Sequence, residues 1–177
     1  YMVLLIVPYF WGAVIGFLLL DQRDEQTLTA LQVTPLPLPG YLAYRLLAPA
    51  LLAALTTLLV MPITGLFDLV WWGYPLLALS VAPLAALALA ALAQNKVQGL
   101  ALMKAAGIVL VPPLIAYFLP AMWQLPFMVA PTWWLAQCFW QLERGAADWW
   151  WLLLGGLLYQ ALLLAWLVRR FDASMHR

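Results

Sequence analysis

The spacing of the ionisable side chains constrains this chain more than any other feature of its sequence. Only 8% of its 177 residues are Asp, Glu, Lys or Arg, and they cluster so that long stretches carry no charge. The charge-free stretches are Tyr1–Leu20, Leu46–Phe67, Leu69–Asn95, Ala105–Leu142 and Trp149–Val168. A helix that crosses a hydrocarbon core of about 30 Å needs about 20 apolar residues, and each stretch is long enough. The pattern therefore predicts a helical membrane protein.

Composition excludes several other classes of protein. Hydrophobic residues make up 67% of the chain, whereas soluble domains are nearer half apolar and about a quarter charged. The apolar character is continuous, as in Leu84–Leu92, and does not alternate as in a transmembrane β-strand. A net charge of +1 argues against a nucleic-acid partner, and one cysteine, Cys138, excludes an intrachain disulfide. We expect one all-α, polytopic domain over residues 1–177.

The stretch Ala105–Leu142 is too long for a single span. Prolines interrupt its second half and disfavour a straight helix there, at Pro120, Pro126 and Pro131. We therefore expect a span at Val97–Phe118, followed by a re-entrant or interfacial region at Pro120–Trp140. This region forms the centre of an outer segment over residues 119–148, and the whole chain has about five spans.

The basic residues support five spans through the positive-inside rule. Five spans place seven of the eight Lys and Arg residues on one side and leave Arg144 opposite, whereas six spans divide them five against three. The seven are Arg23, Arg45, Lys96, Lys104, Arg169, Arg170 and Arg177. This orientation predicts a cytoplasmic C-terminus and an external Tyr1. Because the chain begins with Tyr directly in apolar sequence, we also expect it to be N-terminally incomplete, with at least one earlier span missing.

Two of the expected spans carry stripes of small residues. Gly12 and Gly16 form a G-x-x-x-G pattern in the first span. Alanines recur every four residues in the third span, at Ala78, Ala82, Ala86 and Ala90. Small residues let helix backbones approach closely, so both stripes predict helix packing. The sequence leaves open which helices meet, and a homodimer contact through Gly12 and Gly16 is one option.

Tryptophans gather at the expected outer ends of the spans, among them Trp133, Trp134 and Trp140. Tryptophan favours the headgroup layer, so an aromatic belt is the preferred interpretation. The alternative is that Trp133, Trp134 and Trp140 line an outer vestibule for aromatic or amphipathic substrates, with Trp133 and Trp134 on a substrate path. Lys104 is a second candidate for such a path, because a charge inside a span is often functional. However, Lys104 is also close enough to the inner boundary to extend its side chain to water.

Catalytic and metal-binding patterns are missing from the sequence. There is no G-x-x-x-x-G-K-[ST] phosphate loop and no G-x-S-x-G or H-E-x-x-H motif. One histidine, His176, and one cysteine are too few for a metal cage built on those ligands. We expect neither an enzyme nor a metal site, and no cofactor bound by this chain.

The connection at residues 21–40 is the first loop on the expected cytoplasmic side. Asp24 and Glu25 suit the first turn of a short helix, whose N-terminal dipole favours anions. Leu28 and Leu31 then share one face, and prolines end the pattern, at Pro35, Pro37 and Pro39. Two interpretations remain open from the residues alone: a plain connector, and a docking element for a soluble partner.

The run Leu20-Asp-Gln-Arg-Asp-Glu-Gln-Thr-Leu-Thr-Ala-Leu-Gln-Val-Thr-Pro-Leu, followed by Gly40-Tyr41-Leu42 and Arg45, resembles the ABC type 2 exporter permease family. It is especially similar to members labelled as drug or fluoroquinolone export permeases. In that family an acidic, Gly-Thr-Leu-containing segment before Thr-Pro or Ser-Pro lies between the second and third of six spans and couples to the ATPase. The resemblance assigns that role to Asp24, Glu25, Thr27, Leu28, Leu31, Thr34 and Pro35. Gln26 departs from the family, which usually has glycine there.

The resemblance extends to two other regions of the chain. The turn at Asn95–Leu100 is similar to the family's loop before the fifth span, where a second ATPase contact would lie. The region Pro120–Trp140 is similar to the short outer re-entrant helices between the family's last two spans. The family's first span has no counterpart here.

The function that the resemblance implies is that of a permease subunit of an ATP-driven exporter in the bacterial inner membrane. Its partners would be an ABC ATPase subunit, which binds ATP and magnesium, a second permease copy in a homodimer or heterodimer, and the lipid bilayer. The substrate would be hydrophobic or amphipathic, such as a drug. The main alternative is a structural or assembly subunit that transports nothing. An intramembrane enzyme and an ion channel are disfavoured, since the spans lack paired ionisable residues and a repeated filter sequence.

Overall fold

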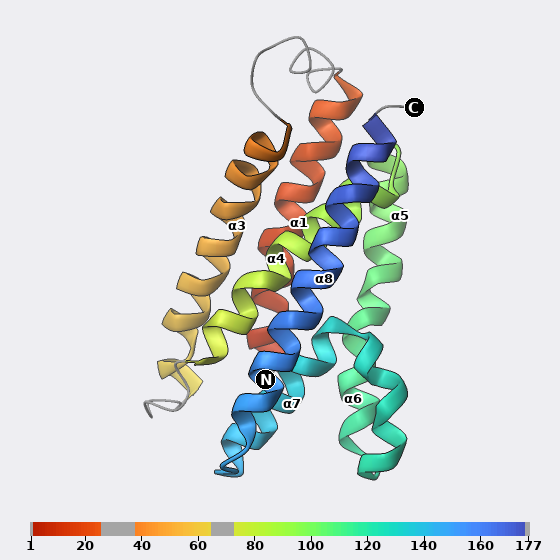
Figure 1. The fold of residues 1–177 in the computed structure, drawn as a ribbon. Coiled ribbons are helices and arrows are strands. Elements are labelled where there is room, and N and C mark those ends of the chain that lie inside the picture. The colour runs from red at the N-terminus through yellow and green to blue at the C-terminus, as the bar shows by residue number, and fades with distance from the viewer. Residues whose placement is uncertain (1, 26–37, 65–72, 176–177) are drawn as a thin grey trace.

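The computed structural model describes residues 2–25, 38–64 and 73–175 of the chain (Figure 1). Within these ranges the secondary structure is entirely helical. The elements are α1 (Met2–Asp24), α3 (Leu38–Val60), η1 (Pro62–Thr64), α4 (Tyr74–Leu92), α5 (Lys96–Ala106), η3 (Gly107–Leu110), α6 (Val111–Tyr117), η4 (Ala121–Val129), α7 (Pro131–Glu143) and α8 (Trp149–Met175). Five helical stretches are long and apolar enough to cross a membrane: α1, α3, α4, α5 with α6, and α8. The predicted all-α class with five spans is confirmed.

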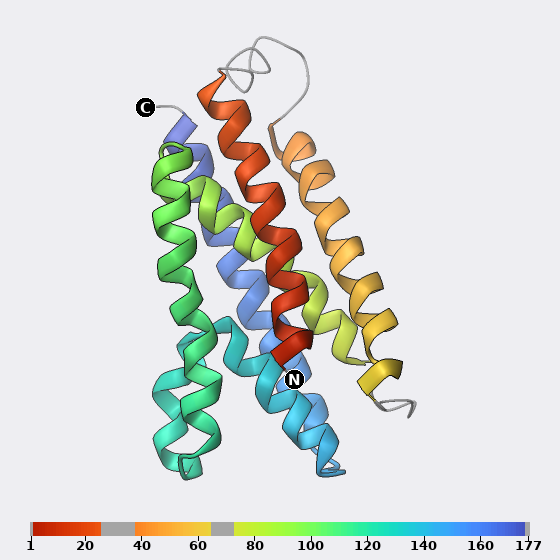
Figure 2. The same ribbon diagram turned by 180° about the vertical axis from the view of Figure 1, so that it is seen from behind.

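Helix α4 lies at the centre of the fold. It contacts α1, α3 and α8 along its length and crosses the bundle diagonally between them (Figures 1 and 2). It is the most buried of the five spans, whereas the span formed by α5 and α6 is the least buried and lies at the edge of the bundle. The alanine-rich sequence of α4 suits this position, because small side chains let three neighbours approach one helix.

The two small-residue stripes pack against each other. A Cβ atom added at Gly12 would lie 2.3 Å from the Ala82 carbonyl oxygen, and one at Gly16 would lie 2.8 Å from Leu89 Cδ1. The alanines of the α4 stripe are all fully or almost fully buried, at Ala78, Ala82, Ala86 and Ala90. The expected helix-packing role therefore belongs to an α1–α4 contact within one chain. A homodimer contact through Gly12 and Gly16 is wrong, because α4 already covers both glycines.

The two ends of the bundle differ in their elements. The C-terminal ends of α1 and α8, the start of α3 and the turn between α4 and α5 lie together at one end. At the other end lie η1, the end of α6 and the connection between α7 and α8 (Figure 1). From that second end η4 runs back into the fold and α7 returns, so the segment over residues 119–148 forms a hairpin. Its elements have 9 and 13 residues, too few to cross a bilayer. Its position on the outer side of the membrane stays a prediction.

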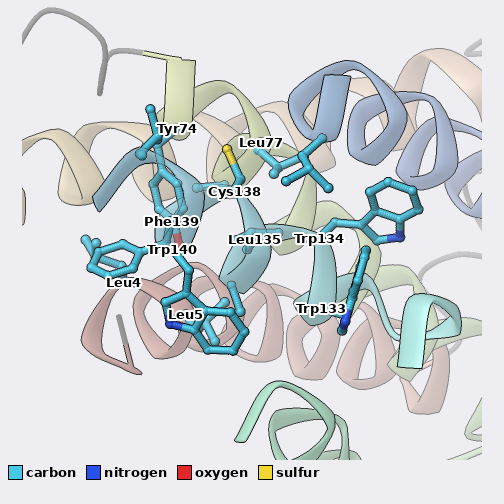
Figure 3. Packing of buried hydrophobic residues seen from close by; sticks show 14 of the residues in the cluster. Leu4, Leu5, Tyr74, Leu77, Trp133, Trp134, Leu135, Cys138, Phe139 and Trp140 are labelled. Carbon is cyan, nitrogen blue, oxygen red and sulfur yellow. The ribbon is translucent and has the colours of Figure 1, made fainter. Parts of the chain in front are cut away.

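The tryptophans of α7 are buried inside the protein. Trp133, Trp134 and Trp140 are 5%, 8% and 4% exposed, and they belong to a core cluster with side chains of α1 and α4 (Figure 3). The expected aromatic belt is therefore wrong for these three residues, because the hairpin turns α7 into the bundle. Other tryptophans are exposed, as a belt requires, at Trp123, Trp150 and Trp151. Trp71 and Trp72 lie outside the described residues.

Two spans differ from the charge-free stretches of the sequence. Helix α3 begins at Leu38, inside the predicted loop of residues 21–40, so the helix extends beyond the charge-free stretch from Leu46 and includes Arg45. Its Nε donates a hydrogen bond to the Tyr41 hydroxyl at 3.2 Å, which shows how a charge near a helix end is accommodated. The fourth span is also not one regular helix, since a 3₁₀ turn at Gly107–Leu110 separates α5 from α6.

Candidate functional site at the charged end

The charged end of the bundle is the site where the sequence predicted a partner contact. We define it by the last turn of α1 with the residue after it (21–25), the start of α3 (41–45), the α4–α5 turn (93–98) and the end of α8 (169–172). Helix α1 is continuous to Asp24, so the predicted coupling loop continues in sequence from this end, although residues 26–37 lie outside the described residues. Contacts made by the last residues of α1 therefore decide what that loop is attached to.

The end of α1 is joined to α5 by two polar contacts. The Lys96 ammonium forms an ion pair with the Asp21 carboxylate, and the Lys96 backbone N–H donates to Asp24 Oδ2 at 3.3 Å. Asn95 caps α5, because its side-chain oxygen accepts the Gln98 backbone N–H at 2.9 Å. The cap fixes where α5 begins and so places Lys96 opposite Asp21.

The same end of α1 is joined to α4 through Arg23. Its guanidinium donates to the carbonyl oxygens of Ala90 and Ala93 at 3.5 and 3.4 Å. Ala90 lies in the last turn of α4 and Ala93 is its C-cap residue, where backbone acceptors have no partner within the helix. A cation there also interacts favourably with the negative end of the helix dipole. Arg23 therefore ties the end of α1 to the end of the central helix.

A third contact joins α1 to α3. The Tyr41 hydroxyl donates to the side-chain oxygen of Gln22, and the Arg45 guanidinium lies 5.8 Å from the centre of the Tyr41 ring. Together with the contacts of Asp21 and Arg23, this bond means that the last turn of α1 is attached to three helices. A displacement of this turn would therefore act on α3, α4 and α5 together.

The described residues include two of the seven predicted coupling residues. Asp24 is the last residue of α1, not the first turn of a separate helix as expected, and Glu25 follows it as an exposed turn residue. The other five lie outside the described residues: Thr27, Leu28, Leu31, Thr34 and Pro35. Their contact with an ATPase stays a prediction.

The predicted substrate-path residues do not form one site. Lys104 is exposed in α5, about 12 Å along the helix from Lys96 at 1.5 Å per residue. Trp133 and Trp134 are packed in the core, where the Trp134 indole N–H donates to the Met128 carbonyl at 3.0 Å and its ring stacks on Tyr159 at 5.9 Å between ring centres. Both tryptophans pack against other side chains rather than line an open vestibule. A role for any of the three in transport stays a prediction.

Two features of the interior were missed by the sequence reasoning. Ser80 of α4 donates a hydrogen bond to the side-chain oxygen of Gln160 in α8, which is fully buried. An apolar groove of about 290 Å³, open to the surface, also lies between α1, α4 and α5. The sequence signal for the Ser80–Gln160 hydrogen bond is that each of these polar residues lies inside an apolar stretch. The groove leaves no such signal, because it depends on which helices become neighbours.

Five apolar spans, joined by polar contacts at one end of the bundle, define a multi-pass helical membrane protein. A model of the family described as "Fluoroquinolones export permease protein Rv2686c-like" matches residues 1–168. The chain belongs to this family. The expected resemblance to drug export permeases is therefore confirmed.

Two curated relatives support this membership. They are the fluoroquinolones export permease proteins Rv2686c and MT2760 of Mycobacterium tuberculosis strains H37Rv and CDC 1551. Each is 33% identical over 168 residues, which cover 92% of this chain and 66% of the relative. The chain thus spans about two thirds of the length of these relatives. No solved structure matches it.

Proposed function

We propose that this protein is the membrane-spanning permease subunit of an ATP-binding-cassette exporter. It moves a hydrophobic or amphipathic substrate, such as a fluoroquinolone, out of the bacterial cell across the inner membrane. A separate ATPase subunit binds ATP and magnesium, and a second permease copy completes the transporter. Membership of the family and the names of the two relatives support the drug-export part of the proposal.

The attachment of the end of α1 to three other helices supports the coupling part of the proposal. The loop predicted to contact the ATPase begins at Glu25, directly after the turn that holds Arg23 and Asp24. When the ATPase closes on ATP, it displaces this loop, and the polar contacts pass the displacement to α4 and α5. The spans then shift between inward-open and outward-open arrangements. Export follows only if the substrate has different affinities for the two.

The charged end faces the cytoplasm in this proposal. Basic residues concentrate there, including Arg23, Arg45, Lys96 and the pair Arg169–Arg170, whereas Arg144 lies near the other end. An excess of Lys and Arg marks the cytoplasmic side of inner-membrane proteins. The loop is then on the side of the membrane where ATP is available.

Reversing the charges at the start of the loop tests the coupling. In the full permease reconstituted with its ATPase, Asp24→Lys with Glu25→Lys should lower substrate-stimulated ATPase activity by about tenfold, the effect of losing roughly 1.4 kcal/mol of interaction. The matched control is Glu143→Lys with Asp148→Lys at the opposite end, which should leave the activity unchanged. Full activity of the first variant in a normally assembled complex would contradict the loop contact.

Co-purification separates an exporter from the alternative of a structural or assembly subunit. A permease solubilised in mild detergent should retain a soluble ATPase, and ATP hydrolysis by the complex should respond to an added fluoroquinolone. A chain that purifies without any ATPase would favour the structural alternative.

A further inference from the structure

A polar pocket of about 370 Å³ lies at the charged end of the bundle and is partly open to the surface. It is formed where the ends of α1, α4 and α8 lie together (Figure 1). Its lining includes Arg23 from α1, Leu92 and Gln94 from the end of α4 and the turn after it, and Arg170 and Ala173 from α8. Pockets that bind small molecules measure about 300–1,000 Å³, so this one has room for a ligand.

Two arginines line the pocket from different helices. Arg23 is held at the end of α4, because its Nη1 donates to the carbonyl oxygens of Ala90 and Ala93. A guanidinium group has five N–H donors in a planar fork, so it can donate to a carbonyl and to an anion at once. Arginine is also the side chain that binds phosphate in the bidentate manner. The pocket therefore offers Arg23 and Arg170 to a group such as a phosphate.

The acidic side chains nearest to these arginines do not line the pocket. Asp172 follows Arg170 by two positions in α8, and helical residues two apart do not face each other. At the end of α1, Asp21 and Asp24 both contact Lys96 of α5. Among the described residues, those that line the pocket carry two positive charges and no negative one. An anion is therefore the ligand that this lining favours.

The sequence of α8 places the pocket at the surface of the membrane. The stretch Trp149–Val168 carries no charge, and the first charges after it are Arg169 and Arg170. Trp166 is 51% exposed, and the Arg170 guanidinium carbon lies 5.6 Å from the centre of its ring. Exposed tryptophans and basic residues at the end of a span mark the headgroup layer. The pocket therefore lies where phospholipid headgroups are.

An exposed apolar ridge runs along α8 from the pocket into the membrane. Leu158, Leu162, Trp166 and Arg170 follow one another every four residues, a spacing that forms one slanted row on a helix surface. The three apolar members are 64%, 63% and 51% exposed. From Leu158 to Arg170 the row is about 18 Å long at 1.5 Å per residue. Half of a hydrocarbon core is about 15 Å thick, so the ridge is as long as one leaflet is deep.

The pocket and the ridge together distinguish between anionic ligands. A free phosphate or an acidic peptide would use the two arginines and leave the ridge uncovered, whereas a phospholipid has a phosphate for the one and an acyl chain for the other. A zwitterionic headgroup would also bring an ammonium group, which meets no carboxylate in the described lining. Basic pockets between membrane helices bind anionic headgroups in this way. The combination favours an anionic phospholipid.

We propose that this pocket binds the phosphate of an anionic phospholipid, with an acyl chain along the ridge of α8. The bound headgroup joins the end of α1 to the end of α8 across the end of the central helix α4. A lipid thus becomes part of the charged end at which coupling is expected. The inference goes beyond the proposed exporter function and does not depend on it.

Native mass spectrometry of the full permease, titrated with dioleoyl-phosphatidylglycerol, tests the site. Arg170→Gln should bind its first lipid about ten- to hundredfold more weakly than the wild type, as expected for a lost hydrogen bond to a charged group. Arg169→Gln is the matched control, because it removes the same charge from the neighbouring residue, which does not line the pocket. This control should stay within about threefold of the wild type, since exposed charges contribute little.

A second variant and two other ligands complete the experiment. Arg23→Gln should also weaken binding, but Arg170→Gln is the decisive variant because Arg23 additionally holds α1 to α4. Dioleoyl-phosphatidylcholine should bind at least about tenfold more weakly than phosphatidylglycerol, a difference of about 1.4 kcal/mol. Glycerol 3-phosphate has the phosphate without acyl chains and should not displace the lipid at a similar concentration.

Each contrary result would overturn a stated part of the proposal. Equal losses in Arg169→Gln and Arg170→Gln, or no loss in either, would show that the pocket is not the lipid site. Phosphatidylcholine bound as tightly as phosphatidylglycerol would overturn the preference for an anionic lipid. Displacement by glycerol 3-phosphate would identify a site for a soluble phosphate instead. Because neither a drug nor ATP is present, these results leave the exporter function standing, and co-purification with an ATPase tests that function separately.

Discussion

At Gly12 the absence of a side chain sets the distance between α1 and α4. A methyl group there would lie 2.3 Å from the Ala82 carbonyl oxygen and 2.6 Å from Ala85 Cβ. Because both neighbours are close to the helix backbone, neither can rotate away. Gly12→Ala should destabilise the protein by about 1–3 kcal/mol, the usual cost of overpacking a core. Thermal unfolding in detergent measures this change.

Gly107 provides the matched control for that substitution. It is also a helical glycine, but a methyl group there meets no atom within 4 Å. Gly107→Ala should leave the midpoint temperature unchanged or raise it slightly, because alanine lowers the conformational entropy of the unfolded chain. Equal midpoints for Gly12→Ala and the wild type would show that the α1–α4 contact is looser than described.

Lys104 is the charged residue that the sequence predicts on a substrate path, and its substitution tests that prediction. Lys104→Gln keeps the length of the side chain nearly unchanged and removes the cation. Norfloxacin, which carries a carboxylate, should bind the variant about three- to tenfold more weakly, in line with about 1 kcal/mol for a partly exposed ion pair. Its methyl ester should bind both proteins equally. An equal loss for the acid and the ester would assign Lys104 a structural role instead.

At the scale of helices, the junction of α1 with α5 is the element contact on which coupling depends. Asp21 and Lys96 are both exposed to solvent, so water screens their ion pair and it contributes little to stability. Lys96→Asp places two carboxylates together and should lower substrate-stimulated ATPase activity without a matching loss of stability. The exchanged pair, Asp21→Lys with Lys96→Asp, should recover most of the activity in the reconstituted complex.

Two comparisons test whether any recovery of activity depends on the attraction between these two side chains. Arg144→Asp alters a cation near the other end of the bundle and should leave the stimulated activity at the wild-type level. If the exchanged pair is no more active than Lys96→Asp alone, attraction between the two side chains is not what couples α1 to α5.

The spans themselves could be predicted from the sequence because charges are excluded from the hydrocarbon core. That rule located five helices, but the charge-free stretch from Leu46 leaves out the first turns of α3, which begins at Leu38. Arg45 lies within α3 and bonds to Tyr41, and long basic side chains near a helix end can reach water in this way. A charge near the boundary therefore does not mark where a helix begins.

The aromatic and small-residue patterns were less informative, because their meaning depends on tertiary arrangement. Tryptophan at an outer end suits a belt when its helix crosses the membrane, but α7 turns back into the bundle and buries Trp133 and Trp134. The Gly12 stripe predicted close packing without naming its partner helix. The identity of that partner, α4, follows only from the assembled fold.

At the scale of the whole molecule, the sequence predicted the charged residues at the end of α1 but not the apolar groove between the helices. Asp24 and Glu25 were found because charges between two apolar stretches must lie outside the membrane core. The apolar groove that Ala105 lines was not, since it depends on how α5 lies against α1 and α4, and no single helix encodes that arrangement. Residue patterns thus located the loop where the ATPase is expected to act, whereas the groove is found only in the assembled fold.

The orientation of the molecule is the last property on which the proposed function depends, and single cysteines can measure it. Gln94 lies at the charged end and Ala147 near the opposite end, and both are exposed. The native Cys138 is buried, and burial raises the pKa of its thiol to about 12. Since the thiolate is the form that reacts, Cys138 should stay unlabelled near pH 7 and serve as the internal control. In intact cells a membrane-impermeant maleimide should label Ala147→Cys at once and Gln94→Cys only after permeabilisation. Labelling of Gln94→Cys from outside intact cells would place the loop after α1 away from cytoplasmic ATP, and the proposed coupling would then fail.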